Sequence, residues 1–255
     1  MSTGPFSLAA LGRVAARVWV PLALVIAWQL WVSVSGVSSL VVPAPLDVAG
    51  DLLSDPGAYV HELRVTLVTA GLGLVLGMAL GFVLALLGWL NPFFSGMTTP
   101  VAMMLRTIPI AALIPVIGRV VGYDVKSVVV VTVLITIFPA FVFATSGLRT
   151  APAGADDLFG VLRSSRFQRL RRLAVPASVP NLLTALRISS SMCILGALVA
   201  EWLIGTDGLG HELNIARIEF RVERLWGIAV VSCALSVAAF LAATGLERWG
   251  TARWS

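Results

Sequence analysis

ADDLFGVLRSSRFQRLRRLAVPASVPNLLTALR (residues 155–187) is a polar, arginine-rich island between two long apolar segments. Each flanking segment is long enough to cross a bilayer, which takes about 20 residues. The island is therefore a loop on one side of a membrane, and its positive charge predicts the cytoplasmic side. Only 12% of the chain is charged, yet the island holds six arginines: Arg163, Arg166, Arg169, Arg171, Arg172 and Arg187. Its leucines recur at roughly helical spacing, so we expect short helices at the membrane surface.

The composition places the chain among integral membrane proteins. Of its 255 residues 58% are hydrophobic, and the mean hydropathy is +0.95, whereas soluble proteins are about 45–50% apolar. We predict an all-α fold of about six transmembrane helices in a single domain, residues 1–255. The net charge of +5 is explained by the topology, so nucleic acid is not an expected partner. Cys193 and Cys233 lie inside apolar runs and are interpreted as packing residues.

The expected spans cover about residues 18–34, 65–87, 97–116, 128–148, 182–204 and 225–246. The first is interpreted as a retained span, because its apolar run is too long for a signal peptide and lacks a small-x-small site. Outer loops are expected at about 37–63 and 205–224, and the basic island lies in a cytoplasmic loop at about 149–181. Residues 46–56 predict a short amphipathic helix with Asp47, Asp51 and Asp55 on one face.

The distribution of lysine and arginine predicts that both termini are cytoplasmic. Eleven of these residues fall on the inner side: Arg13, Arg17, Arg149, Arg163, Arg166, Arg169, Arg171, Arg172, Arg187, Arg248 and Arg253. Six fall on the outer side: Arg64, Arg119, Lys126, Arg217, Arg221 and Arg224. Arg106 is left unassigned.

Two spans carry unusual residues. Gly73, Gly77 and Gly81 stand four apart on one face of the second span, which favours close helix packing over a substrate groove. The third span contains RTIPIAALIP (106–115), and prolines at this depth indicate a broken or kinked helix where a pathway could lie.

Four residues are candidates for a translocation pathway. Met104, Arg106 and Pro109 lie on the broken third span, and Glu201 lies near the outer end of the fifth. An ionisable residue inside a membrane is a functional hypothesis by default. The alternatives are that Arg106 extends to the inner interface and that Glu201 anchors the helix end beside Trp202.

The island resembles the EAA loop of ABC importer permeases, whose pattern is acid-Ala-Ala-x3-Gly-x9-Ile-x-Leu-Pro. Asp157, Arg163 six residues on, and Leu173-x-Val175-Pro176 match its spacing. SVPNLLTALRIS (178–189) and LGALVAEWLIGTDGLG (195–210) resemble the family's fifth span and the following outer loop. VVPAP (41–45) and MMLRTIPIAALIP (103–115) resemble the nitrate, sulfonate and taurine branch of binding-protein-dependent permeases. The resemblance covers roughly residues 20–250.

The match departs from the pattern within the island. Leu158 and Phe159 replace the small pair, and Arg163 replaces the glycine between the two short helices. Glycine would allow a turn with positive φ, which arginine adopts at a cost, so we expect a locally altered turn. An alternative register places Gly160 at the glycine position, but the stretch to Pro176 is then three residues too long.

By this resemblance the island is the coupling helix that docks in a cleft of a cytoplasmic ABC ATPase subunit. Its apolar side chains would enter the cleft while its acids meet cations at the rim. The docking candidates are Asp156, Asp157, Leu158, Phe159, Leu162, Arg163 and Arg166. Alternatively the two aspartates only favour a helix N-terminus, and the arginines contact anionic membrane lipid; both roles are compatible with docking.

The chain is not expected to be an enzyme. It has no phosphate-binding loop of the form G-x4-G-K-[ST], and its lysine, Lys126, follows valine. ATP and Mg²⁺ would therefore bind the partner ATPase, and this chain would hold no cofactor. His61 and His211 are isolated, so no metal site is predicted.

The resemblance implies the membrane subunit of an ATP-driven importer in the bacterial plasma membrane, working as a dimer of identical chains with an extracytoplasmic solute-binding protein. The expected solute is a small organic anion such as a sulfonate, taurine or nitrate; the alternative is a thiamine-precursor pyrimidine or a riboflavin-like solute. An ion-driven secondary transporter would show inverted repeats and more acids at mid-membrane, which the sequence does not show. A scaffold without transport would leave the broken third span unexplained.

Overall fold

The computed structural model describes residues 8–91, 93–94, 96–97, 100, 104, 109–150 and 154–252, with side chains from residue 19 onward except at 156, 157 and 160. Every regular element in these residues is helical, as predicted. The elements are α1 (Leu8–Ser35), α2 (Pro45–Ser54), α3 (Pro56–Leu90), α5 (Ile110–Val121), α6 (Val125–Leu148), α7 (Ala155–Val161), α8 (Arg166–Arg169), the π-helix η1 (Leu170–Ala174), α9 (Val175–Ile204), α10 (Leu209–Ile218) and α11 (Val222–Thr251).

Four helices in the described residues are long and apolar enough to cross a membrane: α3, α6, the continuous helix Arg166–Ile204, and α11. Two shorter apolar segments, Trp19–Ser35 and Ile110–Val121, correspond to the expected first and third spans. Much of the expected third span (97–116) lies outside the described residues. Its continuous helical part is α5, which begins after Pro109 and continues to Val121, with Pro115 inside the helix.

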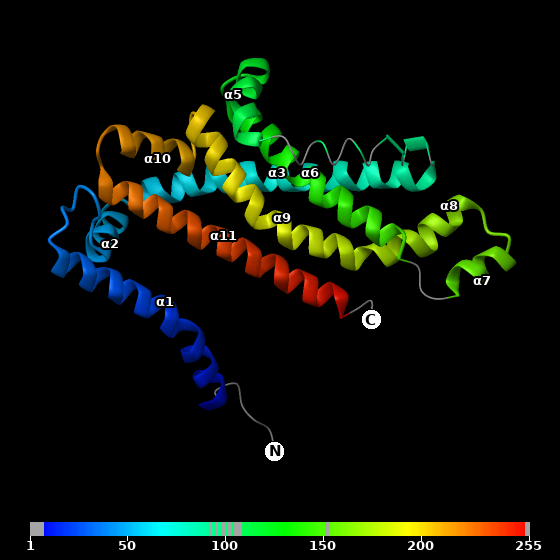
Figure 1. The fold of residues 1–255 in the computed structure, drawn as a ribbon, viewed down its shortest axis with the longest axis horizontal. Coiled ribbons are helices and arrows are strands. Elements are labelled where there is room, and N and C mark those ends of the chain that lie inside the picture. Colours follow the sequence, from blue (N-terminus) through cyan, green and yellow to red (C-terminus); the bar gives the residue numbers. More distant parts are fainter. Residues whose placement is uncertain are drawn as a thin grey trace.

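The helices form an elongated bundle (Figure 1). α3, α6 and α9 make up its centre, and α11 runs along α9. α2 and α10 lie together at one end of the bundle, and α7 and α8 lie at the opposite end. α1 diverges from the bundle, but its Trp28 ring lies 5.1 Å from the ring of Trp226 in α11, measured between centroids.

The glycine face of α3 packs directly on α6, which confirms the expected close approach. A Cβ atom at Gly81 would lie 2.6 Å from Cβ of Ala140, and one at Gly77 would lie 2.7 Å from Cβ of Thr136. Gly73 faces Thr132 in the same way. Small residues at such contacts let helix backbones approach closely inside a membrane, where association depends on van der Waals packing.

The end of the bundle that contains α2 and α10 is more helical than the sequence predicted. α3 begins at Pro56 instead of residue 65, because Asp55 accepts a hydrogen bond from the Ala58 N–H and proline occupies the first helical position. The expected outer loop 37–63 is therefore a short loop, α2 and the first turns of α3. Likewise, the expected loop 205–224 contains α10 and the start of α11.

The fifth span also begins earlier than expected. The chain is helical from Arg166, passes through the π-helix Leu170–Ala174 and continues as α9 to Ile204. The wide turn precedes Pro176, whose ring would clash with the carbonyl four residues back in a regular α-helix. The expected cytoplasmic loop 149–181 thus ends in helix, and α9 is joined without interruption to η1 and α8.

Candidate functional site

The α7–α8 element, residues 155–169, is a pair of short helices joined by a tight turn. Arg163 has φ +47° at this turn, and the Ser164 N–H donates to the Phe159 carbonyl at 3.1 Å. This bond is typical of a helix C-terminus whose next residue is left-handed. Arg163 therefore occupies the position that the preferred register assigns to glycine. Arginine itself adopts the positive φ at this turn.

Large apolar side chains project from this charged element. Four of them are more than half exposed: Leu158 (58%), Leu162 (65%), Phe167 (66%) and Val161 (82%). Phe159 is half-buried, and the side chains of Asp156 and Asp157 lie outside the described residues. Val161 and Phe167 were not among the sequence candidates; their place beside Leu162 and Arg166 was the available signal. Exposed apolar clusters with a polar rim are typical of interaction sites.

Arg166 joins this element to the bundle. Its Nη1 donates to the Leu90 carbonyl in the last turn of α3 at 3.1 Å. Trp89 Nε1 donates to the Leu148 carbonyl at the end of α6, also at 3.1 Å. Each bond satisfies a carbonyl that the end of a helix leaves free. Arg166, expected on the docking surface, thus contacts α3 within its own chain.

At the opposite end, Glu201 is buried, with 1% of its surface exposed. Its carboxylate accepts hydrogen bonds from Thr66 Oγ1 at 2.7 Å and Thr69 Oγ1 at 3.2 Å, both on α3. It also accepts from the Gly210 N–H at 3.1 Å. Burying a charge is costly unless it is hydrogen-bonded. Here the Thr66 hydroxyl and the Gly210 N–H are the main donors, because the single Thr69 hydroxyl proton is shared with the carbonyls of Val65 and Thr66.

The first turn of α10 is bound to the same two spans. The Gly208 N–H donates to Glu62 at 2.6 Å, and the Leu209 N–H donates to Thr66 Oγ1 at 2.9 Å. Gly208 has φ +100°, and a Cβ atom at this position would overlap the Glu201 carboxyl group. We refer to Glu62, Thr66, Thr69, Glu201 and the backbone of 208–210 as the Glu201 cluster. Of its members, the sequence indicated only Glu201; the spacing of the two threonines along one face of α3 was the missed signal.

A second cluster braces α10 against α2 and α11, and we call it the Arg224 cluster. Arg224 is buried, its Nε lies 3.2 Å from Glu212 Oε1, and its guanidinium lies 4.2 Å above the Tyr59 ring. Its Nη atoms approach Asp51 at 3.7 Å and Asp55 at 3.6 Å. Tyr59 donates to Asp51 at 2.6 Å. The aspartates predicted as an acidic helix face thus serve partly to hold α2, α3, α10 and α11 together.

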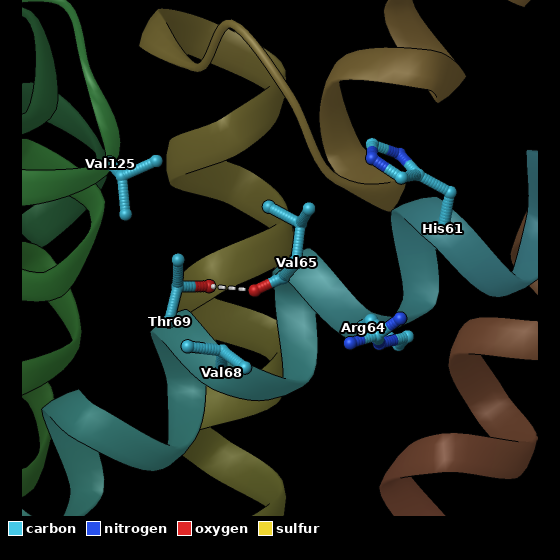
Figure 2. Close-up of a pocket in the computed structure, with 6 residues that line it drawn as sticks. All are labelled: His61, Arg64, Val65, Val68, Thr69 and Val125. Carbon is cyan, nitrogen blue, oxygen red and sulfur yellow. Dashed lines mark hydrogen bonds between the residues drawn. The ribbon is translucent and has the colours of Figure 1, made fainter.

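A pocket of about 380 Å³ lies between α3 and the start of α6 (Figure 2). It is lined by His61, Arg64, Val65, Val68, Thr69 and Val125. Figure 2 shows Thr69 bonded to the Val65 carbonyl at the wall of this pocket. Thr69 also bonds to Glu201. The Thr69 hydroxyl has one proton to share between these acceptors, and Glu201 is not among the lining residues.

The other pathway candidates lie at the start of α5 or before it. Pro109 immediately precedes the first turn of α5, Met104 is exposed, and Arg106 lies outside the described residues. A groove of about 420 Å³ is lined by Ile110, Leu134, Ile135, Phe138, Pro139, Val142, Phe143, Ile188 and Met192. These lining residues, from α5, α6 and α9, are all apolar.

An ion pair joins α9 to α11 closer to the α7–α8 end. Arg187 Nη1 lies 3.0 Å from Glu247 Oε2, and Thr184 Oγ1 donates to Glu247 Oε1 at 2.7 Å. Arg187 was expected only to mark the inner boundary of the fifth span. Its pairing shows that the charge also contributes to the packing of two spans.

The sequence and the fold resemble those of known transport proteins. The formylaminopyrimidine transport permease protein ThiX of Halalkalibacterium halodurans is 31% identical over 228 residues, which are 89% of this chain and 90% of that protein. The putative aliphatic sulfonates transport permease protein SsuC of Bacillus subtilis is 28% identical over 200 residues, 77% of this chain and 72% of that protein.

The fold is that of a solved importer chain. A chain of the MetNI methionine ABC transporter in an inward-facing conformation aligns with a TM-score of 0.60 at 18% identity, covering 74% of this chain and 92% of that chain. The model of the family described as binding-protein-dependent transport system inner membrane component matches residues 73–249, more than half of the chain. The chain therefore belongs to this family, the membrane permeases of ABC importers.

Proposed function

We propose that this permease docks a cytoplasmic ABC ATPase on its α7–α8 element and, with a second copy of itself, encloses the pathway of a small solute. ATP and Mg²⁺ would bind the ATPase, since no phosphate-binding loop occurs in this sequence. Closure of two ATPase subunits would move the α7–α8 element and rock the spans, so that the pathway opens to each side in turn. A solute-binding protein would deliver the solute at the α2–α10 end.

The observation that supports docking is the apolar group on the α7–α8 element. Leu158, Val161, Leu162 and Phe167 are exposed although they belong to a segment too charged to enter the bilayer core. The positive φ of Arg163 fixes the angle between the two short helices that carry them. A hydrophobic surface of this kind, in a segment that also carries the exposed Arg163 and Arg166, suits an apolar cleft with charged edges.

Co-purification tests docking. We expect an ATPase subunit to co-purify from detergent with the tagged wild-type chain and to be lost from Leu158→Glu, because a carboxylate in the cleft would be buried without a partner. Leu53→Glu is the control, since Leu53 is an even more exposed leucine on a short helix at the opposite end. Retention of the ATPase by Leu158→Glu would contradict docking at this surface.

We propose a small organic anion as the solute, with a pyrimidine as the second candidate. The sulfonate permease relative and Arg106 support the anion. The pyrimidine permease relative and the uncharged groove with Phe138 and Phe143 support the second candidate, since flat rings pack well against aromatic side chains.

Uptake into proteoliposomes separates the two solutes. Transport of labelled taurine that falls with Arg106→Gln and persists with Phe138→Ala would support the anion. Transport of a labelled formylaminopyrimidine with the reverse dependence would support the pyrimidine and overturn the anion.

A further inference from the structure

The start of α10 is fixed by bonds to two spans. An α-helix leaves its first N–H groups without partners, yet Gly208, Leu209 and Gly210 all donate to side chains of α3 or α9. Two of the acceptors are the carboxylates of Glu62 and Glu201, whose charge suits the positive end of a helix. α10 is therefore a docked helix whose first turn is held to the spans.

Glycines let the α10 backbone lie directly on Glu201. A Cβ atom at Gly210 would lie 2.7 Å from Cβ of Glu201, and one at Gly208 would overlap the carboxyl group. Non-bonded carbon atoms do not approach this closely, so a side chain larger than that of glycine at position 208 or 210 would separate α10 from α9. Leu209, between the glycines, is fully buried with Tyr59, Ala216 and Ile228.

The helix that carries Glu201 extends to the α7–α8 element. α8, η1 and α9 are continuous from Arg166 to Ile204, 39 residues, or roughly 58 Å at 1.5 Å per residue. One end of this helix joins the proposed ATPase-docking surface, and Glu201 lies one turn from the other end. A displacement of the docking surface therefore reaches Glu201 through a single helix.

We propose that Glu201 is a positioning residue for transport, which makes α10 move with α9 when the ATPase drives the α7–α8 element. The inference rests on the proposed function. In this mechanism α10 changes position when the ATPase binds or releases nucleotide. The Glu201 carboxylate transmits the motion, because it holds the first turn of α10 against α9 and α3.

Two reporter positions separate motion of α9 from motion of α10. Leu203→Cys lies at the end of α9 and Ile218→Cys at the end of α10, and both side chains are exposed. Each would be spin-labelled in a chain with Cys193→Ala and Cys233→Ala, in the purified complex with its ATPase. The distance between the labels of the two copies would be measured without nucleotide and after trapping with ATP, Mg²⁺ and vanadate.

In otherwise unchanged chains we expect both distances to shift on trapping. In Glu201→Leu, which has similar volume but no acceptor, the shift at position 203 persists and the shift at position 218 is lost. Gly208→Ala should act in the same way by displacing α10 from the carboxyl group. Glu201→Gln keeps an acceptor and should restore the shift at 218. The control Glu219→Leu removes an exposed carboxylate of the α10–α11 turn that bonds Arg221, and it should leave both shifts intact.

The outcomes distinguish this inference from the proposed function. A full shift at 218 in Glu201→Leu would overturn the positioning role and leave the importer mechanism standing. Equal loss of both shifts in that variant would also overturn it, because Glu201 would then support the fold in general. If no ATPase co-purifies with the wild-type chain, or neither distance responds to trapping, the proposed function fails together with the inference.

Discussion

Arg163 adopts a backbone conformation that glycine adopts more easily. Its φ of +47° lies in the left-handed region, which costs an ordinary residue roughly 1–2 kcal/mol. The neighbouring bond from Ser164 to Phe159 completes the turn, so the conformation is fixed by the turn and not by the side chain.

Substitutions at Arg163 should change the free-energy cost of its positive φ. Arg163→Gly should stabilise the turn by roughly 1 kcal/mol, and Arg163→Val should destabilise it further, since a β-branched side chain tolerates positive φ least. Hydrogen exchange of the amides in 155–165 measures the effect. Exchange should be slower than wild type in the glycine variant and faster in the valine variant; unchanged exchange in both would show that the turn carries no strain.

α3 and α6 pack closely, with three glycines of α3 set against Thr132, Thr136 and Ala140. The contact has the four-residue spacing of one helical turn, so each glycine meets a residue at the same height on the partner. We expect two helices packed in this way to move as one body. If α3 slid along α6, the side chains of α6 would collide with the α3 backbone.

Alanine substitutions on α3 should therefore have opposite effects on two faces. Gly81→Ala places a methyl group 2.6 Å from Cβ of Ala140 and should cost about 1–3 kcal/mol through overpacking. Gly71→Ala meets nothing within 4 Å and should gain up to about 1 kcal/mol in helix propensity. Thermal unfolding in detergent measures both; a Gly81→Ala chain as stable as wild type would contradict the rigid contact.

The two ends of the bundle are held together by different kinds of contact. The α7–α8 end exposes apolar side chains. It is joined to the spans by side-chain hydrogen bonds to helix-terminal carbonyls, such as the bond from Arg166 to the Leu90 carbonyl. The α2–α10 end is held by the Glu201 and Arg224 clusters, in which buried charges are paired or fully hydrogen-bonded. This asymmetry agrees with the proposal that the ATPase binds at the α7–α8 end and that the solute is delivered at the α2–α10 end.

Topology gives the whole-molecule prediction. Positive loops stay cytoplasmic, so in cells that make this chain without its ATPase, Leu162→Cys should react with a membrane-impermeant maleimide only after the cells are opened. Leu53→Cys should react in intact cells. Both side chains are well exposed, and the chain would again carry Cys193→Ala and Cys233→Ala. Labelling of Leu162→Cys in intact cells would reverse the predicted orientation.

The sequence was sufficient where a local pattern has one physical meaning. Apolar length predicted the spans, glycine spacing predicted the α3–α6 contact, and the match at Asp157, Arg163 and Pro176 predicted the α7–α8 element. It was insufficient where partners come from distant parts of the chain. Glu201 is 135 residues from Thr66 and 139 from Glu62, and no local pattern links them. The second span was expected to begin at residue 65, whereas Asp55 and Pro56 set the start of α3 at residue 56.

The donors to Glu201 also bear on how the protein is made. A carboxylate within a span is costly in lipid, and the cost is smaller near the end of a helix, where Glu201 lies, than at its centre. Synthesis from the N-terminus places Thr66 and Thr69 in the membrane before the ribosome reaches codon 201, and Gly210 follows nine residues later. The threonine hydroxyls are therefore already in the membrane when Glu201 is inserted. A circularly permuted chain that began with α9 would insert the same acid before any partner existed, and its biogenesis should fail although its final contacts would be identical.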